Sequence, residues 1–253
     1  MASLTIFQLA EIGLVAFVAQ VGGCIIGGGG FLIQPFLISL GVPPQMAVAN
    51  DIGGAIASSL SAAAGFTKRN LIRTDIVHIL LPGLVVGALL GCFVLNSLPP
   101  RLIEKLIGCF GLIFLARVLL FRDRATQPTA TRDPQKHRPL VVWSVALSLG
   151  AYTTFSGAGI GTLSAVLLAR AFRLSFTESL GVRWVCLPAA MAVGLATYWS
   201  LGLIVLPLLF ALAIGNVVAG QVASRLVVTI GEQVLRTLFI VSLGAFVLYL
   251  LAR

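Results

Sequence analysis

The chain has 253 residues, of which 58% are hydrophobic and only 10% are charged, and its mean hydropathy is +1.06. A soluble domain carries about 25% charged residues, so this composition excludes a water-soluble globular protein and indicates an integral membrane protein. The net charge of +9 does not indicate a nucleic-acid partner, because the basic residues cluster between apolar segments, as in the cytoplasmic loops of membrane proteins.

Apolar segments follow one another along the chain with roughly the length of a membrane crossing, which takes about 20 helical residues. They are residues 4–26, 44–66, 75–96, 101–121, 140–155, 178–198, 204–224 and 233–251. The first has no basic region before it and contains Glu11, so it predicts a retained span rather than a cleaved signal peptide. Two shorter apolar segments, residues 31–40 and 160–172, follow glycine-rich breaks and are too short to cross alone. Tyr152, Tyr198, Trp143 and Trp199 lie near span ends and are interpreted as interface anchors.

A polar segment divides the chain in the middle. Residues 122–139 read RDRATQPTATRDPQKHRP, which is basic and contains prolines, so they predict a solvated cytoplasmic linker. The predicted organisation is therefore a first transmembrane repeat over residues 1–121, this linker, and a second transmembrane repeat over residues 140–253.

The two halves match each other when Asp51 is aligned with Arg183, an offset of 183 − 51 = 132 residues. The same offset pairs Gly27 with Gly159, Gly29 with Gly161, and Gly83 with Gly215. Internal repeats with glycine-interrupted segments at corresponding positions are typical of secondary transporters, whose substrate sites lie at those interruptions. The predicted fold is an all-α integral membrane protein with two homologous repeats, whose glycine-broken short helices meet near the midplane.

The distribution of positive charge predicts that the repeats are inverted. With an odd number of crossings per half, eleven basic loop residues lie in the cytoplasm against three outside; with an even number, the division is nine against five. The eleven are Lys68, Arg69, Arg73, Arg122, Arg124, Arg132, Lys136, Arg138, Arg170, Arg173 and Arg225, and the three are Arg101, Lys105 and Arg253. Cytoplasmic loops carry the excess of Lys and Arg, which favours inversion.

The glycine runs raise the question of why a helix would break where no water can satisfy its backbone. Irregular backbone at membrane depth is tolerated where it is buried in protein or lines a watery cavity. The free N–H groups that start the next half-helix carry partial positive charge, which suits an anion. The alternative is that these glycines only allow close packing between helices.

Two charged residues fall inside predicted spans. Asp51 lies seven residues after Pro44, about 10 Å along a helix, and Arg183 takes the matching place in the second half. Charges at this depth are costly and usually functional. Two interpretations stay open: an ion pair that locks the halves together, or an Arg183 that receives an anionic substrate while Asp51 holds the arginine or relays a proton.

The candidate substrate-binding residues are the glycines of both breaks, the two buried charges and nearby polar side chains. They are Gly27, Gly28, Gly29, Gly30, Gln34, Asn50, Asp51, Ser156, Gly157, Gly159, Gly161, Arg183 and Asn216. Each polar side chain taken alone is better explained by a hydrogen bond between packed helices than by a role as a ligand. The two histidines and four cysteines show no metal-ligand spacing, so we predict no metal, cofactor or catalytic residue.

A succession of short motifs runs through nearly the whole chain. It includes Gly27–Gly30 with Phe31-Leu32, Leu40-Gly41-Val42-Pro43-Pro44, Ala47-Val48-Ala49, Ser58-Ser59-Leu60-Ser61, Lys68-Arg69-Asn70, and Pro82-Gly83 with Gly87-Ala88-Leu89-Leu90-Gly91. In this succession the chain resembles the TauE/SafE family of bacterial membrane proteins, which are associated with export or uptake of sulfite and organosulfur anions. The family often has Thr-Ser after the Ala-Val-Ala element, where this chain has Asn50-Asp51, and that difference is where we look for substrate specificity.

The resemblance and the residues together predict a multi-pass protein of the bacterial inner membrane. It would be a secondary transporter, exporter or permease, for small sulfur-containing anions such as sulfite or sulfoacetate, working by alternating access. Its partners would be the anion and the lipid bilayer, with no nucleic acid, and a homodimer stays open. A passive anion channel and a membrane-embedded enzyme are the alternatives. No ATP-binding GxxxxGK[ST] motif is present, so pumping would need an ion gradient or a separate ATPase.

Overall fold

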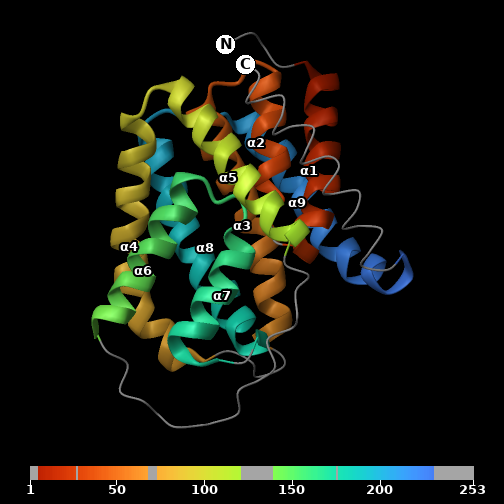
Figure 1. Ribbon diagram of the computed structural model, residues 1–253. Helices are drawn as coiled ribbons and strands as arrows, with labels where there is room; N and C mark the ends of the chain where they lie inside the picture. The colour runs from red at the N-terminus through yellow and green to blue at the C-terminus, as the bar shows by residue number, and fades with distance from the viewer. Residues whose placement is uncertain (1–4, 27, 68–72, 121–138, 175, 231–253) are drawn as a thin grey trace.

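The computed structural model describes residues 5–26, 28–67, 73–120, 139–174 and 176–230, and within them all regular structure is helical (Figure 1). The helices are α1 (Ile6–Ile26), α2 (Gly30–Ser39), α3 (Pro44–Thr67), α4 (Thr74–Ser97), α5 (Pro100–Leu120), α6 (Pro139–Phe155), α7 (Ile160–Phe172), α8 (Phe176–Ser200) and α9 (Leu206–Ile230). The all-α class is confirmed. The predicted span 233–251 and linker residues 122–138 lie outside the described residues.

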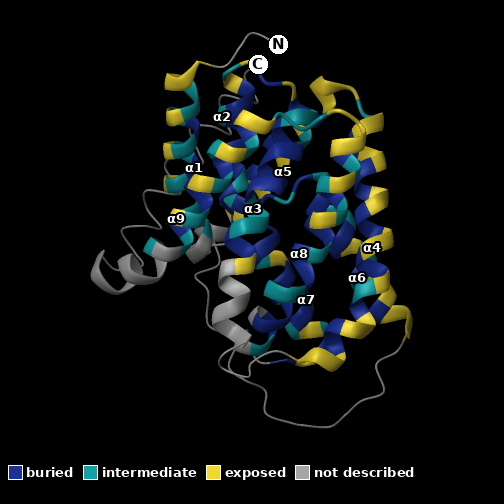
Figure 2. Ribbon diagram, turned by 180° about the vertical axis from the view of Figure 1, so that it is seen from behind, coloured by how far each residue is buried: buried dark blue, intermediate teal, exposed yellow. Residues whose placement is uncertain are grey.

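The outer surface of the bundle is apolar, as lipid contact requires. On α4, Leu84 and Ala88 are buried, whereas Leu89 and Phe93 are exposed, Phe93 by 71%. Figure 2 shows such exposed positions along the outward sides of the peripheral helices. A soluble monomer rarely exposes large contiguous apolar patches. These helices therefore turn one apolar face to the protein core and another to the membrane.

Two helices in the described part are long and apolar enough to cross a membrane by length and composition. They are Thr74–Ser97 and the segment Gly181–Ser200 of α8. Shorter apolar helices include Ile6–Val21, Pro139–Phe155 and Leu206–Gly220. The two short helices that were predicted after the glycine breaks are present as α2 and α7, and Figure 1 places them toward opposite ends of the molecule.

The helices pack in pairs that join the two halves of the chain. Helix α4 runs along α6, α1 runs along α9, and α3 contacts both α8 and α9 (Figure 1). Glycines allow the closest approaches. A Cβ atom at Gly83 would lie 2.6 Å from the Ala146 Cβ, between α4 and α6, and a Cβ at Gly215 would overlap the Gly13 carbonyl oxygen, between α9 and α1. The matched glycines 83 and 215 thus pack matched helix pairs.

Candidate functional site

The second helix break, between α6 and α7, has a backbone that requires glycine. Gly157 and Gly159 have φ angles of +63° and +73°, in the left-handed region that residues with a side chain rarely adopt. The backbone N–H of Gly157 donates to the Tyr152 carbonyl at 2.9 Å, and the Tyr152 hydroxyl donates to the Ala158 carbonyl at 2.7 Å. Tyr152 therefore stabilises this break through both its backbone carbonyl and its side-chain hydroxyl.

The first break, between α1 and α2, needs glycine for a different reason. Gly29 has φ and ψ angles of −51° and −39°, which any residue can adopt. A Cβ there would lie 2.7 Å from Gln20 Oε1 and 3.1 Å from the Ala19 carbonyl oxygen. Gly29 is thus required because α2 begins against the side of α1. Gly27 lies outside the described residues.

The two breaks lie against each other. A Cβ at Gly30 would be 3.2 Å from the Cα of Ala158, and one at Gly159 would be 2.6 Å from Cε2 of Phe31. The Gln34 side chain on α2 also donates from Nε2 to the carbonyl oxygen of Ser156. Gln34 and Ser156 are 122 residues apart in the sequence, so the two halves of the chain are in direct contact here.

Asp51 projects from α3 toward the start of α2 and is only 6% exposed. Its Oδ2 accepts a hydrogen bond of 2.9 Å from Gln34 Nε2. A Cβ at Gly30 would lie 2.8 Å from the same oxygen, so the carboxylate sits directly beside the first residue of α2. The N-terminus of a helix favours negative charge, and here Asp51 provides that charge from within the protein.

Arg183 holds the corresponding place in the second half. It is 7% exposed, and its Nη1 donates to the Gly161 carbonyl oxygen at 2.8 Å, in the first turn of α7. Its guanidinium carbon lies 4.1 Å from the ring centroid of Trp184, a cation–π contact. Arg183 is therefore held at the second break by the backbone of α7 and by an aromatic ring.

The predicted ion pair between these two residues is not present in the described part of the structure. Asp51 interacts with Gln34 beside α2, and Arg183 interacts with Gly161 in α7. The interpretation of a pair that locks the halves together is corrected accordingly.

Several buried polar atoms have no hydrogen-bond partner among the described residues. They are Oε1 of Gln34, Oγ of Ser156, and both amide atoms of Asn216. Leaving such an atom unsatisfied costs about 1–3 kcal/mol, so native proteins usually supply a partner such as water or a ligand. Gln34 and Ser156 stand where the breaks touch, which gives that junction an unused capacity for polar binding. Asn216 lies on α9, which packs on α1 and α3.

Asn50 has its amide fully occupied elsewhere. Its Nδ2 donates to the carbonyl oxygens of Met46 and Leu203, and its Oδ1 accepts from the Val205 N–H at 3.0 Å. These contacts tie α3 to the connection between α8 and α9. Asn50 thus has a structural role in this conformation, and a substrate would have to displace three hydrogen bonds to use it.

Both tyrosines that were interpreted as interface anchors have interior roles. Tyr198 is fully buried and donates from its hydroxyl to the Thr154 carbonyl oxygen, while Tyr152 braces the second break as described above. The sequence does give a signal for Tyr152, because it precedes the Gly157 break by one and a half helical turns, where a side chain can reach back to the loop. Tyr198 has no such signal.

A groove between α4 and α8, with a volume of about 530 Å³, is of a different kind. It is lined by Val86, Leu89, Leu90, Phe93, Asn96, Thr197 and Leu201. Nearly all of this lining is apolar, and the leucines and Phe93 belong to the exposed outer surface of the bundle. It offers nothing to an anion and is distinct from the junction of the breaks.

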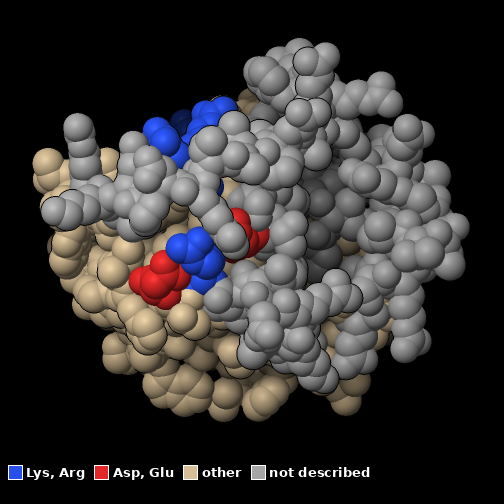
Figure 3. All heavy atoms as spheres, turned by 90° about the horizontal axis from the view of Figure 1, so that it is seen from below, with Lys and Arg blue, Asp and Glu red and all other residues tan. Residues whose placement is uncertain are grey.

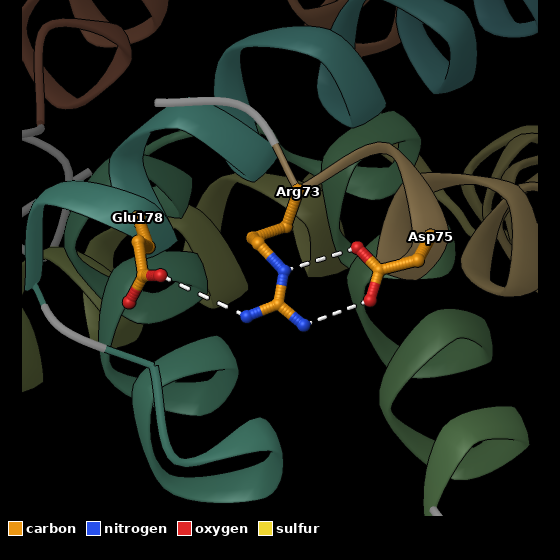
Figure 4. A network of polar contacts seen from close by, with 3 residues as sticks. All are labelled: Arg73, Asp75 and Glu178. Carbon is orange, nitrogen blue, oxygen red and sulfur yellow. Dashed lines mark hydrogen bonds and ion pairs between the residues drawn. The ribbon is translucent and has the colours of Figure 1, made fainter. Parts of the chain in front are cut away.

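A charged cluster lies at the end of the molecule seen from below in Figure 3. Figure 4 shows Arg73 between two carboxylates: its Nη2 lies 2.8 Å from Asp75 Oδ2, and its Nη1 lies 3.8 Å from Glu178 Oε1. Arg73 precedes α4, and Glu178 is in the first turn of α8, so the cluster joins the two halves. Exposed pairs of this kind contribute about 0–1 kcal/mol, which makes this contact easy to open.

The apolar outer surface, the paired long helices and the buried charges at two touching helix breaks define an integral membrane protein of the transporter class. The chain belongs to the TauE/SafE family: the family's sequence profile, described as "Sulfite exporter TauE/SafE", matches residues 12–250. The resemblance found in the motifs is thereby confirmed.

Relatives with curated names agree with this class. A "Probable membrane transporter protein" of Haemophilus influenzae is 24% identical over 247 residues, covering 92% of this chain and 90% of the relative. The "Probable membrane transporter protein YfcA" of Escherichia coli K12 is 23% identical, covering 91% and 86%. YjnA of Bacillus subtilis, with the same description, is 24% identical over 65% of this chain and 68% of its own length. No solved structure gives a significant match.

Proposed function

We propose that this protein is a secondary transporter that moves a small sulfur-containing anion, such as sulfite or the organosulfonate sulfoacetate, across the bacterial inner membrane. Residues 1–121 and 140–253 form two inverted repeats joined by a cytoplasmic linker, and alternating access opens their shared site to one side and then to the other. The observation that carries this proposal is the contact between the two helix breaks, with a buried charge at each.

The helix contacts support a two-fold relation between the halves. If α1–α4 correspond to α6–α9, then the contact of α1 with α9 corresponds to that of α6 with α4, and the contact of α3 with α9 corresponds to that of α8 with α4; all four occur. The contacts of α2 with α3 and of α7 with α8 correspond in the same way. The location of α2 and α7 toward opposite ends in Figure 1 favours inverted over parallel repeats.

The second break has the features of an anion site. The Arg183 guanidinium is a planar donor fork that matches the paired oxygens of a sulfonate or carboxylate, and its Nη1 donates to the Gly161 carbonyl oxygen at the start of α7. The Ser156 hydroxyl adds a buried donor at the same break. The start of α7 adds partial positive charge. The family's description as a sulfite exporter supports a sulfur oxyanion as the substrate class.

The test is uptake by the purified protein in proteoliposomes, with radiolabelled sulfite, sulfoacetate, taurine, sulfate and lactate compared at equal concentration. The proposal predicts saturable uptake of the sulfur oxyanions, with mutual competition and little uptake of lactate. Liposomes that contain the Arg183→Ala variant are the matched control. Flux that rises linearly with concentration would instead identify a passive channel, and selective lactate uptake would overturn the substrate class.

A further inference from the structure

We infer that Asp51 is the proton-binding site that couples transport to a proton gradient, and that Gln34 carries its protonation state to the second helix break. The inference deepens the proposed function, on which it rests for the anion, and it names the coupling ion. It follows from the way in which one buried amide is shared between the two halves of the chain.

Gln34 is fully buried on α2 and links a titratable group to the opposite half. Its Nε2 donates both to Asp51 Oδ2 at 2.9 Å and to the carbonyl oxygen of Ser156. An amide nitrogen has two N–H donors, so both are used. The Ser156 carbonyl can only accept a hydrogen bond, which fixes the orientation of the amide. Its Oε1 has no hydrogen-bond partner among the described residues.

This arrangement fits an ionised Asp51 and changes when the carboxylate takes up a proton. An ionised carboxylate only accepts hydrogen bonds, whereas a protonated one has an O–H to donate. When the proton is on Oδ2, the atom that accepts from Gln34, the unused Oε1 of Gln34 can accept this O–H. A half-turn of the amide brings Oε1 to Asp51, but it then also presents Oε1 to the Ser156 carbonyl, and two acceptors cannot bond. Protonation at Oδ2 therefore releases the hydrogen bond that joins the two breaks.

Asp51 can bind a proton independently of the titratable groups around it. Its own helix and α2 carry no other titratable side chain. The helices packed against α3 carry further titratable or charged residues: Tyr152 on α6, Glu178, Arg183, Cys186 and Tyr198 on α8, Arg101, Glu104, Lys105, Cys109 and Arg117 on α5, and Arg225 on α9. In the described part of the chain, none of these forms a hydrogen bond or ion pair with Asp51.

The sign of the coupling follows from charge. An ionised Asp51 repels an anion that approaches the junction, and its neutralisation removes this repulsion while the second break is released from Gln34. Proton binding at Asp51 and anion binding at Arg183 therefore strengthen each other, and thermodynamic linkage makes the effect reciprocal. The anion should bind more tightly as the pH falls, by at most about tenfold per pH unit for one linked proton.

The test uses the purified full-length protein with sulfoacetate, whose sulfonate and carboxylate are both ionised between pH 5.5 and 8. Titration calorimetry in two buffers of different ionisation enthalpy counts the protons taken up per anion between pH 5.5 and 8. We expect uptake approaching one proton in the wild type and in the control Glu104→Gln. Asp51→Asn should bind with no proton uptake and with a pH-independent affinity. Unchanged uptake in Asp51→Asn would overturn the inference.

Gln34→Met separates a positioning role from a merely structural one. This variant keeps the shape of the side chain but lacks the amide, so Asp51 should still titrate, while the pH dependence of anion affinity should shrink to the part that comes from the charge of Asp51. An infrared difference spectrum between low and high pH, recorded without any anion, follows the C=O stretch of the protonated acid. The band should be present in the wild type and in Gln34→Met and missing in Asp51→Asn. If no anion binds, the proposed function fails, but this spectrum still decides on the proton site; a band that persists in Asp51→Asn refutes it.

Discussion

Replacing Gly30 with alanine is the sharpest test of the junction between the breaks. The added Cβ would lie 2.8 Å from Asp51 Oδ2, 0.6 Å inside the 3.4 Å where ordinary contact begins, and 3.2 Å from the Ala158 Cα on the other side. With backbone on one side, the carboxylate has to move, and it loses its 2.9 Å hydrogen bond from Gln34. A hydrogen bond to a charged group contributes about 1.5–3 kcal/mol, so we expect the free energy of unfolding to fall by up to this amount and the anion affinity to fall because the junction is displaced.

Gly220→Ala is the matched control, because a Cβ at Gly220 meets nothing within 4 Å. Alanine is also a better helix former than glycine by about 1 kcal/mol, so the control should be neutral or slightly stabilised. Sulfoacetate affinity by calorimetry and thermal unfolding in detergent are measured on both variants. If Gly30→Ala binds like the control, at equal stability, the junction is not where the anion is handled.

Three further predictions follow from the arrangement of the halves. A single cysteine at Leu174, introduced into a cysteine-free background, should be labelled from the cytoplasm; labelling from outside would favour parallel repeats. Arg183→Ala should reduce anion affinity at least tenfold, and Arg183→Lys should restore it poorly because a point charge replaces a bidentate fork; an Arg183→Ala variant that folds and binds normally would contradict the assignment. Arg73→Gln removes the exposed Arg73–Glu178 contact and should lower the free energy of unfolding by at most about 1 kcal/mol. A cysteine introduced at Ser156 should then be labelled faster from the end of the molecule where this contact lies. Unchanged labelling would show that the contact does not gate access.

The helices and their breaks were predictable because their causes are local. Twenty apolar residues in a row specify a membrane helix, and consecutive glycines specify an interruption. The offset of 132 residues pairs Asp51 with Arg183, and the structure places each beside a short helix, Asp51 beside α2 and Arg183 beside α7. The packing of α1 on α9 and of α4 on α6 is the pattern that the proposed repeat symmetry predicts.

The partners of individual side chains were not predictable in the same way. Repeat symmetry suggested that the two charges face each other, but in the structure the carboxylate accepts from the amide of Gln34 on α2, and the guanidinium donates to the backbone of α7. The sequence position of Asn50 suggested a ligand for the substrate. In the structure, its side-chain amide instead forms hydrogen bonds with the backbone of Leu203 and Val205, and Leu203 is 153 residues away in the sequence. Such choices depend on distances of a few tenths of an ångström, which no sequence pattern encodes.

Counterflow in proteoliposomes tests the central claim most directly. Vesicles that contain the protein are loaded with unlabelled sulfoacetate or sulfite and diluted into a trace of the labelled anion, with no proton gradient imposed. A transporter that alternates access at one shared site must accumulate label transiently above equilibrium, and vesicles loaded with lactate must not. Label that only equilibrates, without an overshoot for any sulfur-containing anion, would contradict the account.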